Sequence, residues 1–178
     1  MKKSQISFVA LFAVLMLFGA CRNNKNETEA STGANVASST VTVSSDDWYW
    51  DNTSWRVDID YDNITEDITD YGAVLVYMES QNTWRQLPMT FYYTDNDSEG
   101  NVIYCSSSLE VSTYDKGLSI FWTENDFYDG YRPDEHRFKI VVIEANIYAA
   151  RSDVDFSDYN AVRTAFGITE DKDIELIK

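Results

Sequence analysis

The chain is poor in the residues on which most enzyme and metal sites depend, with one histidine, two cysteines and seven glycines among 178 residues. No Cys/His spacing typical of a zinc site is present, and no glycine-rich segment could cradle a phosphate. A Gly-x-Ser-x-Gly nucleophile elbow is also missing, and His136 is followed by Arg137, whose charge disfavours protonation of the imidazole. We therefore interpret His136 as a structural polar residue and expect a protein without a cofactor and without enzymatic activity.

Basic residues are scarce as well. The chain has 14 Lys and Arg against 30 Asp and Glu, a formal net charge of −16. Loss of residues 1–20 would remove two lysines and no acids, leaving 12 basic against 30 acidic residues and a net charge of −18. Nucleic acids and anionic membrane surfaces repel such a chain, so we expect no nucleic acid among its partners.

The sequence also lacks an apolar run of about 20 residues, the length that a membrane-spanning helix needs. The longest run, Ile6–Phe18, is apolar except for Ser7, and two lysines precede it. Small residues follow at positions 19 and 20, directly before Cys21. This order of a positive start, a short apolar stretch and small residues predicts a cleaved signal peptide over residues 1–20.

The Gly-Ala-Cys ending of this segment resembles the lipobox of bacterial lipoproteins. The resemblance implies that Cys21 carries a diacylglycerol on its sulfur and becomes the new N-terminus. More than one acyl chain gives stable membrane attachment. The alternatives are an ordinary secretory signal, with Cys21 unmodified, and an uncleaved anchor helix.

Residues 21–45 consist mostly of Asn, Thr, Ser, Ala and Glu with isolated valines, so we expect a lipidated, disordered linker. Residues 46–178, about 130 in number, suffice for one domain with a single core. Cys105 then has no disulfide partner inside the domain, and its apolar neighbours indicate a buried small hydrophobe. An aromatic content of 15% favours sheet over helix.

The best-patterned element is residues 54–62, where Trp55, Val57, Ile59 and Tyr61 alternate with Arg and Asp, as in a half-buried strand. Similar but weaker patterns predict strands at 73–78, 84–94, 102–107, 109–114, 118–123 and 136–143. Pro88 interrupts the segment 84–94, which implies an edge position or a bend. In the last of these strands, Arg137 and Lys139 should face outward, with Phe138 and Ile140 inward.

The period changes near the C-terminus, where Ser157 can cap a helix that Gly167 ends. Tyr159, Val162 and Phe166 form the apolar stripe of this helix. The predicted fold class is all-β: an antiparallel β-sandwich of about seven strands with one short C-terminal helix.

Three core segments, residues 72–78, 84–88 and 137–143, and the terminal Asp158–Val162 with Gly167-Ile168 resemble small lipoproteins of Bacteroidota. The resemblance covers nearly the whole mature chain and implies a cell-envelope protein anchored through Cys21, but no activity. Surface-displayed lipoproteins of that phylum usually carry an acidic stretch after the cysteine. Here residues 22–25 read Arg-Asn-Asn-Lys, which favours the periplasmic face of the outer membrane.

Asp95, Asp97 and Glu99 alternate before Gly100 as in a calcium-binding loop. The position that closes such a loop with a bidentate Glu is Ser106, so this segment alone offers too few oxygens. A polar hairpin turn is the favoured interpretation, and a metal site is the alternative.

The aromatic residues are the remaining candidates for ligand binding: Trp48, Trp50, Phe127, Tyr128 and Tyr131. Exposed rings stack on sugars, whereas in the alternative interpretation the tryptophans belong to the core. We expect a non-enzymatic binding or structural module of the envelope, held to the lipid bilayer, with a glycan or an envelope protein as partner. The runner-up is a carbohydrate-binding lipoprotein. A hydrolase ranks third and would require a cleft that collects His136 with carboxylates.

Replacing Cys21 by alanine should release the protein from the membrane fraction and leave the domain folded. The sulfur is the only attachment point that the sequence offers, and it lies outside the domain. Fractionation of cells measures the effect. Retention of the variant in the membrane pellet at normal strength would contradict the anchor hypothesis.

Overall fold

The structure is a computed structural model that describes residues 36–125, 131–169, 172–174 and 176. Every described residue belongs to the larger of the two units into which the chain divides, residues 31–178. The predicted signal peptide and Cys21 therefore lie outside the described residues. Within the described ranges, no helix combines the length and apolar character needed to cross a membrane.

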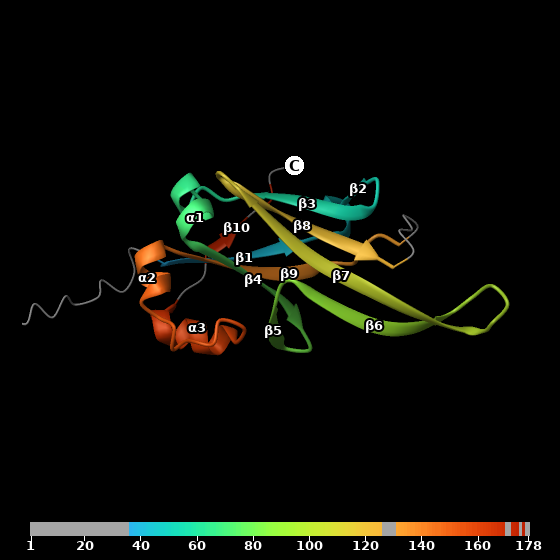
Figure 1. Ribbon diagram of the computed structural model, residues 1–178. Helices are drawn as coiled ribbons and strands as arrows, with labels where there is room; N and C mark the ends of the chain where they lie inside the picture. The colour runs from blue at the N-terminus through green and yellow to red at the C-terminus, as the bar shows by residue number, and fades with distance from the viewer. Residues whose placement is uncertain (1–35, 126–130, 170–171, 175, 177–178) are drawn as a thin grey trace, which may run out of the picture. The chain divides into compact units, whose positions relative to one another are not determined.

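Two five-stranded sheets pack face to face (Figure 1). The first sheet has the order β10 (Lys172–Ile174), β1 (Val36–Val43), β9 (His136–Ile143), β4 (Ala73–Ser80) and β5 (Thr83–Gln86). The second has the order β2 (Tyr49–Asp51), β3 (Ser54–Asp60), β8 (Gly117–Glu124), β7 (Val102–Tyr114) and β6 (Met89–Asn96). Among the described strand pairs, only β1 and β10 run parallel. The predicted antiparallel sandwich is confirmed, with ten described strands instead of about seven.

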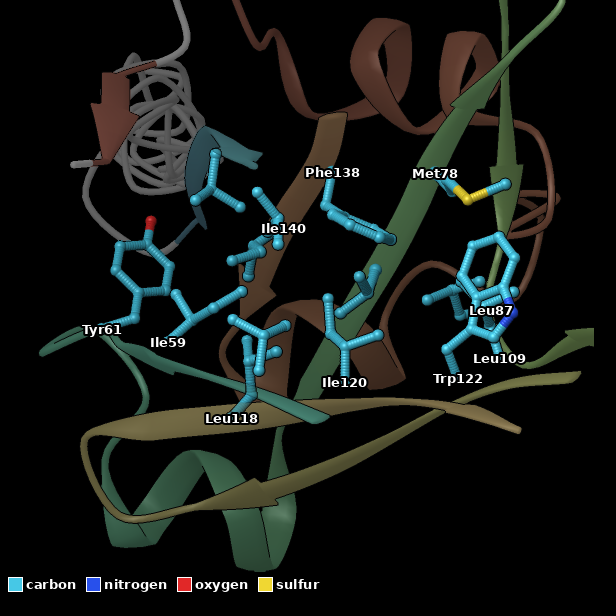
Figure 2. Close-up of a cluster of buried hydrophobic side chains, with 14 of the residues drawn as sticks. Ile59, Tyr61, Met78, Leu87, Leu109, Leu118, Ile120, Trp122, Phe138 and Ile140 are labelled. Atoms are coloured by element: carbon cyan, nitrogen blue, oxygen red, sulfur yellow. The ribbon is translucent and has the colours of Figure 1, made fainter. Parts of the chain in front are cut away.

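The alternation predicted around β3 is present, and it places one face of the strand in the core between the sheets. Trp55, Val57, Ile59 and Tyr61 are buried, while Asp58 and Asp60 are exposed. The register pairs Ile59 with Leu118 and Val57 with Ile120 on β8. In Figure 2, Ile59, Leu118 and Ile120 of the second sheet face Phe138 and Ile140 of β9.

The prediction of a disordered linker is wrong for residues 36–45. Val36–Val43 form β1, which lies between β9 and β10, and the turn of 3-10 helix η1 (Ser45–Asp47) follows it. Val41 and Val43 are fully buried, and a 2.9 Å hydrogen bond joins Ser39 Oγ and Tyr61 Oη. A segment of small and β-branched residues has little to bury alone, but pairing with β9 supplies the apolar surface that it lacks. The remaining linker residues, 21–35, lie outside the described residues.

The interruption at Pro88 separates two strands that belong to different sheets. β5 is an edge strand of the first sheet and β6 is an edge strand of the second, with a cis Leu87–Pro88 peptide bond between them. The edge position predicted from the proline is therefore confirmed for both. Conversely, the strands predicted at 102–107 and 109–114 form one continuous strand, β7.

Three short helices complete the described fold: α1 (Glu66–Tyr71), α2 (Ala145–Ala149) and α3 (Tyr159–Phe166). Helix α3 begins one residue later than predicted, since Asp158 and not Ser157 accepts the capping hydrogen bond, from the backbone N–H of Asn160. Gly167 ends the helix in the left-handed region, at φ 62°. The predicted stripe is buried and forms a second apolar cluster on the outer side of the first sheet, with Leu75, Tyr77, Val141 and Ile143. This cover explains the unbroken apolar runs in β4 and β9.

Because α3 covers this face, Lys139 is buried and not outward in solvent as predicted. Its ammonium lies 4.6 Å from the centre of the Trp84 ring and 4.4 Å from that of Tyr159. Nζ also donates a 3.1 Å hydrogen bond to the Tyr159 hydroxyl. Aromatic faces and a hydroxyl replace part of the hydration that the ammonium loses.

Ile59→Asp should lower the free energy of unfolding by several kcal/mol, because it places a charge without a partner in the core. Asp60→Asn, one residue along the strand, changes an exposed side chain and should cost less than about 0.5 kcal/mol. Denaturant titration of both variants measures the contrast. Similar midpoints for the two would contradict the assigned faces of β3.

Candidate functional site

A cleft of about 390 Å³ opens at the end of the sandwich where β9 begins and β8 ends. Both sheets contribute to it. In the first sheet, the end of β4, the β4–β5 turn, β5 and the start of β9 line the cleft, together with the segment just before β9. In the second sheet, β6 and β8 line it. The lining residues are Met78, Glu79, Ser80, Gln81, Arg85, Met89, Phe91, Trp122, Tyr131, Asp134 and His136.

Stacked and edge-on aromatic rings line the cleft. The His136 imidazole stacks on the Trp122 indole, with ring centres 4.9 Å apart and planes at 21°. Phe91 meets the same indole edge-on at 5.4 Å. Trp48 also contacts Trp122 edge-on, at 6.3 Å, and is itself only 1% exposed. Trp122 therefore supports the exposed parts of His136 and Phe91 instead of facing solvent itself.

A buried carboxylate holds this indole in place. Glu124, which is 6% exposed, accepts hydrogen bonds from Trp122 Nε1 at 2.6 Å and Tyr93 Oη at 2.7 Å. Ser107 Oγ donates to the same carboxylate at 2.7 and 2.8 Å. Burial first, and then the hydrogen bond to Glu124, raise the pKa of Tyr93 to about 12. Three neutral donors thus satisfy Glu124 and restrict the rotation of Trp122.

The sequence analysis missed Glu124, although a signal for it exists. In β8, Leu118, Ile120 and Trp122 alternate toward the core, and the same period places Glu124 on that face. An acidic residue at a core-facing position next to tryptophan predicts a buried hydrogen-bonded carboxylate.

Charged and polar groups form the rim of the cleft. Glu79 accepts a 2.7 Å hydrogen bond from Arg137 Nη1, and the exposed side chains of Arg85 and Asp134 lie at the same opening. Burial lowers the pKa of His136, and the charge of Asp134 opposes this effect only in part, so the folded state favours the neutral imidazole. Tyr131 stands at the opening with 49% of its surface exposed. Burial, followed by the charges of Asp134 and Glu124, raises the pKa of its hydroxyl.

The predicted ligand-binding residues fare differently. Tyr131 lines the cleft as an exposed ring. The prediction that Trp48 contacts a ligand is wrong, because the turn after β1 places this side chain between the sheets, against Trp122 and Phe138. Trp50 is half-buried and packs edge-on against Trp55, 5.6 Å between ring centres, and it does not line the cleft. Phe127 and Tyr128 lie outside the described residues.

The acidic segment between β6 and β7 is a hairpin turn. Asp97 accepts hydrogen bonds from the backbone N–H groups of Glu99 and Asn101 and from the Asn101 side chain. The bond from the Asn101 side chain contributes most to lowering the pKa of Asp97, and backbone donors add to it. Asp95 accepts a bond from the neighbouring backbone N–H of Asn96. Over the described ranges, no three His, Cys, Asp or Glu residues are grouped so that they could hold a metal ion, so the alternative of a site at Asp95, Asp97 and Glu99 finds no support.

The cleft does bring His136 together with Glu79 and Asp134, which is the arrangement that a hydrolase would require. However, no hydrogen bond between His136 and a hydroxyl or carboxylate is found among the described residues, so the described part of the cleft shows no nucleophile–base pair. No family model, no curated protein and no solved structure matches the chain. What the site does therefore has to be argued from its own geometry: a ring-lined cleft with polar groups around its opening.

His136→Phe should reduce the loss of stability between about pH 7 and about pH 5. Burial lowers the pKa of folded His136 below the ordinary value near 6.5, so the unfolded chain binds the proton first as pH falls. The stability that the neutral ring contributes is complete above about pH 6.5 and declines below it. Melting temperatures of both proteins across this range measure the difference, and His136 is the only histidine of the chain. Parallel curves would contradict the assignment.

Proposed function

We propose that this chain is a lipid-anchored protein of the bacterial cell envelope that binds neutral carbohydrate in the cleft and catalyses no reaction. The observation that carries the proposal is the arrangement of rings at the opening. Tyr131 is half-exposed there, and His136 is held flat against Trp122, which Glu124 fixes in turn. A sugar presents an apolar face of C–H groups, and a rigid, flat ring is the surface that best covers it.

The polar rim supports the same ligand class. Glu79 and Asp134 can accept hydrogen bonds from sugar hydroxyls, and the Arg85 guanidinium can donate them. The volume, about 390 Å³, falls within the range of small-molecule sites, about 300–1,000 Å³. The net charge of −16 disfavours uronic acids and other anionic sugars, which is why we propose a neutral one.

Membrane attachment in this proposal rests on Cys21. In the sequence, fourteen residues, 22–35, lie between Cys21 and the start of β1. The short, basic segment after Cys21 favours a location of the protein on the periplasmic face of the outer membrane. Cys105→Ala is the matched control for the Cys21→Ala release experiment, since Cys105 lies in β7 and should not affect anchoring.

The first experiment is a screen of the purified protein against an array of neutral and anionic glycans, followed by calorimetry with the neutral glycans that bind. Tyr131→Ala should weaken binding at least about fivefold, as expected from the loss of about 1 kcal/mol of stacking. Tyr71→Ala is the matched control, because Tyr71 is 72% exposed but belongs to α1 and does not line the cleft.

Two outcomes would contradict the proposal. One is the absence of binding to any neutral glycan on the array. The other is equal affinity of the Tyr131→Ala variant and the unmodified protein. Release of reducing sugar from a bound glycan would instead favour the hydrolase, and it would assign a chemical role to the carboxylates beside His136.

A further inference from the structure

Four of the described strands lie at sheet edges, and three of these are protected against pairing with another chain. β2 and β10 have three residues each, and β5 has four. Each carries a charged residue: Asp51 in β2, Asp173 in β10 and Arg85 in β5. Arg85 of β5 also forms an isolated antiparallel bridge with Asp158, which covers part of that edge. Short length, charge and cover are the usual devices that stop edge-to-edge association.

The fourth edge, β6, has none of these devices along most of its length. It is eight residues long, and its first six residues, Met89–Thr94, carry no charge and no proline. It pairs in the second sheet with β7 alone. The backbone N–H and C=O groups on its other side are therefore a row of donors and acceptors that another strand could use.

The β6–β7 hairpin, which contains this edge and whose tip extends beyond the other strands in Figure 1, carries many of the exposed large apolar side chains among the described residues. Tyr92 is 82% exposed and Tyr104, on the neighbouring strand β7, is 84% exposed. The register pairs Tyr92 with Ser106 and Thr94 with Tyr104, so both tyrosines lie on one face of the hairpin. Val102, at 61% exposure, extends the same face. Exposed apolar side chains gathered in one place indicate an interaction surface.

Charged residues are missing from most of both strands of this hairpin, although Asp95, Asp97 and Glu99 lie at its tip. Residues 86–94 and 101–109 contain no Asp, Glu, Lys, Arg or His, although the chain as a whole has 30 acidic and 14 basic residues. Two copies of a chain with a net charge of −16 repel each other over most of their surfaces. Residues 89–94 are therefore a stretch along which two copies can pair without placing two carboxylates opposite each other.

We propose that β6 is the contact surface for a second copy of this chain. Two copies join edge to edge through antiparallel β6 strands, and their five-stranded sheets become one continuous sheet. Antiparallel pairing of identical strands is self-complementary under a two-fold axis, because each copy supplies the same donors and acceptors. In a register centred on Tyr92, the two Tyr92 residues lie opposite each other, and Phe91 of each copy lies opposite Tyr93 of the other.

This contact does not depend on the ligand of the cleft, but it determines where the two clefts of a dimer lie. Met89 and Phe91 of β6 line the cleft, so pairing through β6 would place the two clefts of a dimer beside the shared edge. A second binding event on one polymeric ligand is then intramolecular.

Site-specific photo-crosslinking in the full chain tests the proposal. A photoreactive phenylalanine analogue replaces Tyr92 in one variant and Tyr71 in a matched control, since both are highly exposed tyrosines but Tyr71 lies on α1. We expect a covalent product of twice the chain mass from position 92 and not from position 71. Equal dimer yields from both positions, or a position-92 product containing a different protein, would contradict the proposal that a second copy of this chain pairs with β6.

Sedimentation of the purified chain over a range of concentrations provides the second measurement. Tyr92→Lys places like charges opposite each other across the two-fold axis and should weaken the dimer at least about tenfold. Tyr71→Lys, the matched control, should leave the dimer unchanged. Melting curves verify that both variants fold, and Thr94→Lys replaces Tyr92→Lys if the latter does not. A monomeric parent chain, or a dimer unaffected by a lysine on β6, would overturn the proposal.

Discussion

The burial of β9 on both of its faces is the constraint on which the rest of the described fold depends. Six consecutive residues, 138–143, are buried. Phe138, Ile140 and Val142 point into the core between the sheets, while Val141 and Ile143 pack in the cluster that α3 completes. A strand buried on both sides needs a partner on each edge and a layer over each face. β1, β4, the second sheet and α3 meet those needs.

The same strand positions the cleft. His136 is the first residue of β9, so its ring is placed by a strand whose next residues are locked in the core. Trp122, on which it stacks, is held by Glu124 through a 2.6 Å hydrogen bond. Rings fixed in this way lose little rotational freedom when a ligand binds, and that favours affinity for a flat sugar face.

Charge is distributed unevenly over the described surface. The proposed ligand site has charged groups around it, whereas most of the proposed contact surface for a second copy has none. Carboxylates and a guanidinium group lie around the cleft, where the sugar that we propose as ligand would need donors and acceptors. Residues 89–94 of β6 and 102–109 of β7 carry no charged side chain. β6 belongs to both surfaces, because Phe91 lines the cleft and Tyr92 points to the opposite face of the strand. Binding of a ligand and pairing of two copies can therefore use different groups of one strand.

Local patterns in the sequence determined the elements whose partners lie nearby or whose two faces differ in polarity. The alternation around Ile59, the break at Pro88 and the stripe of α3 ending at Gly167 were all predicted correctly. Tertiary structure decided the rest. β1 became a strand through pairing with a segment about a hundred residues away, and Lys139 was buried by a helix that follows it. Periodicity reports how one segment divides between apolar and polar faces, but the partner that covers a face is a non-local contact.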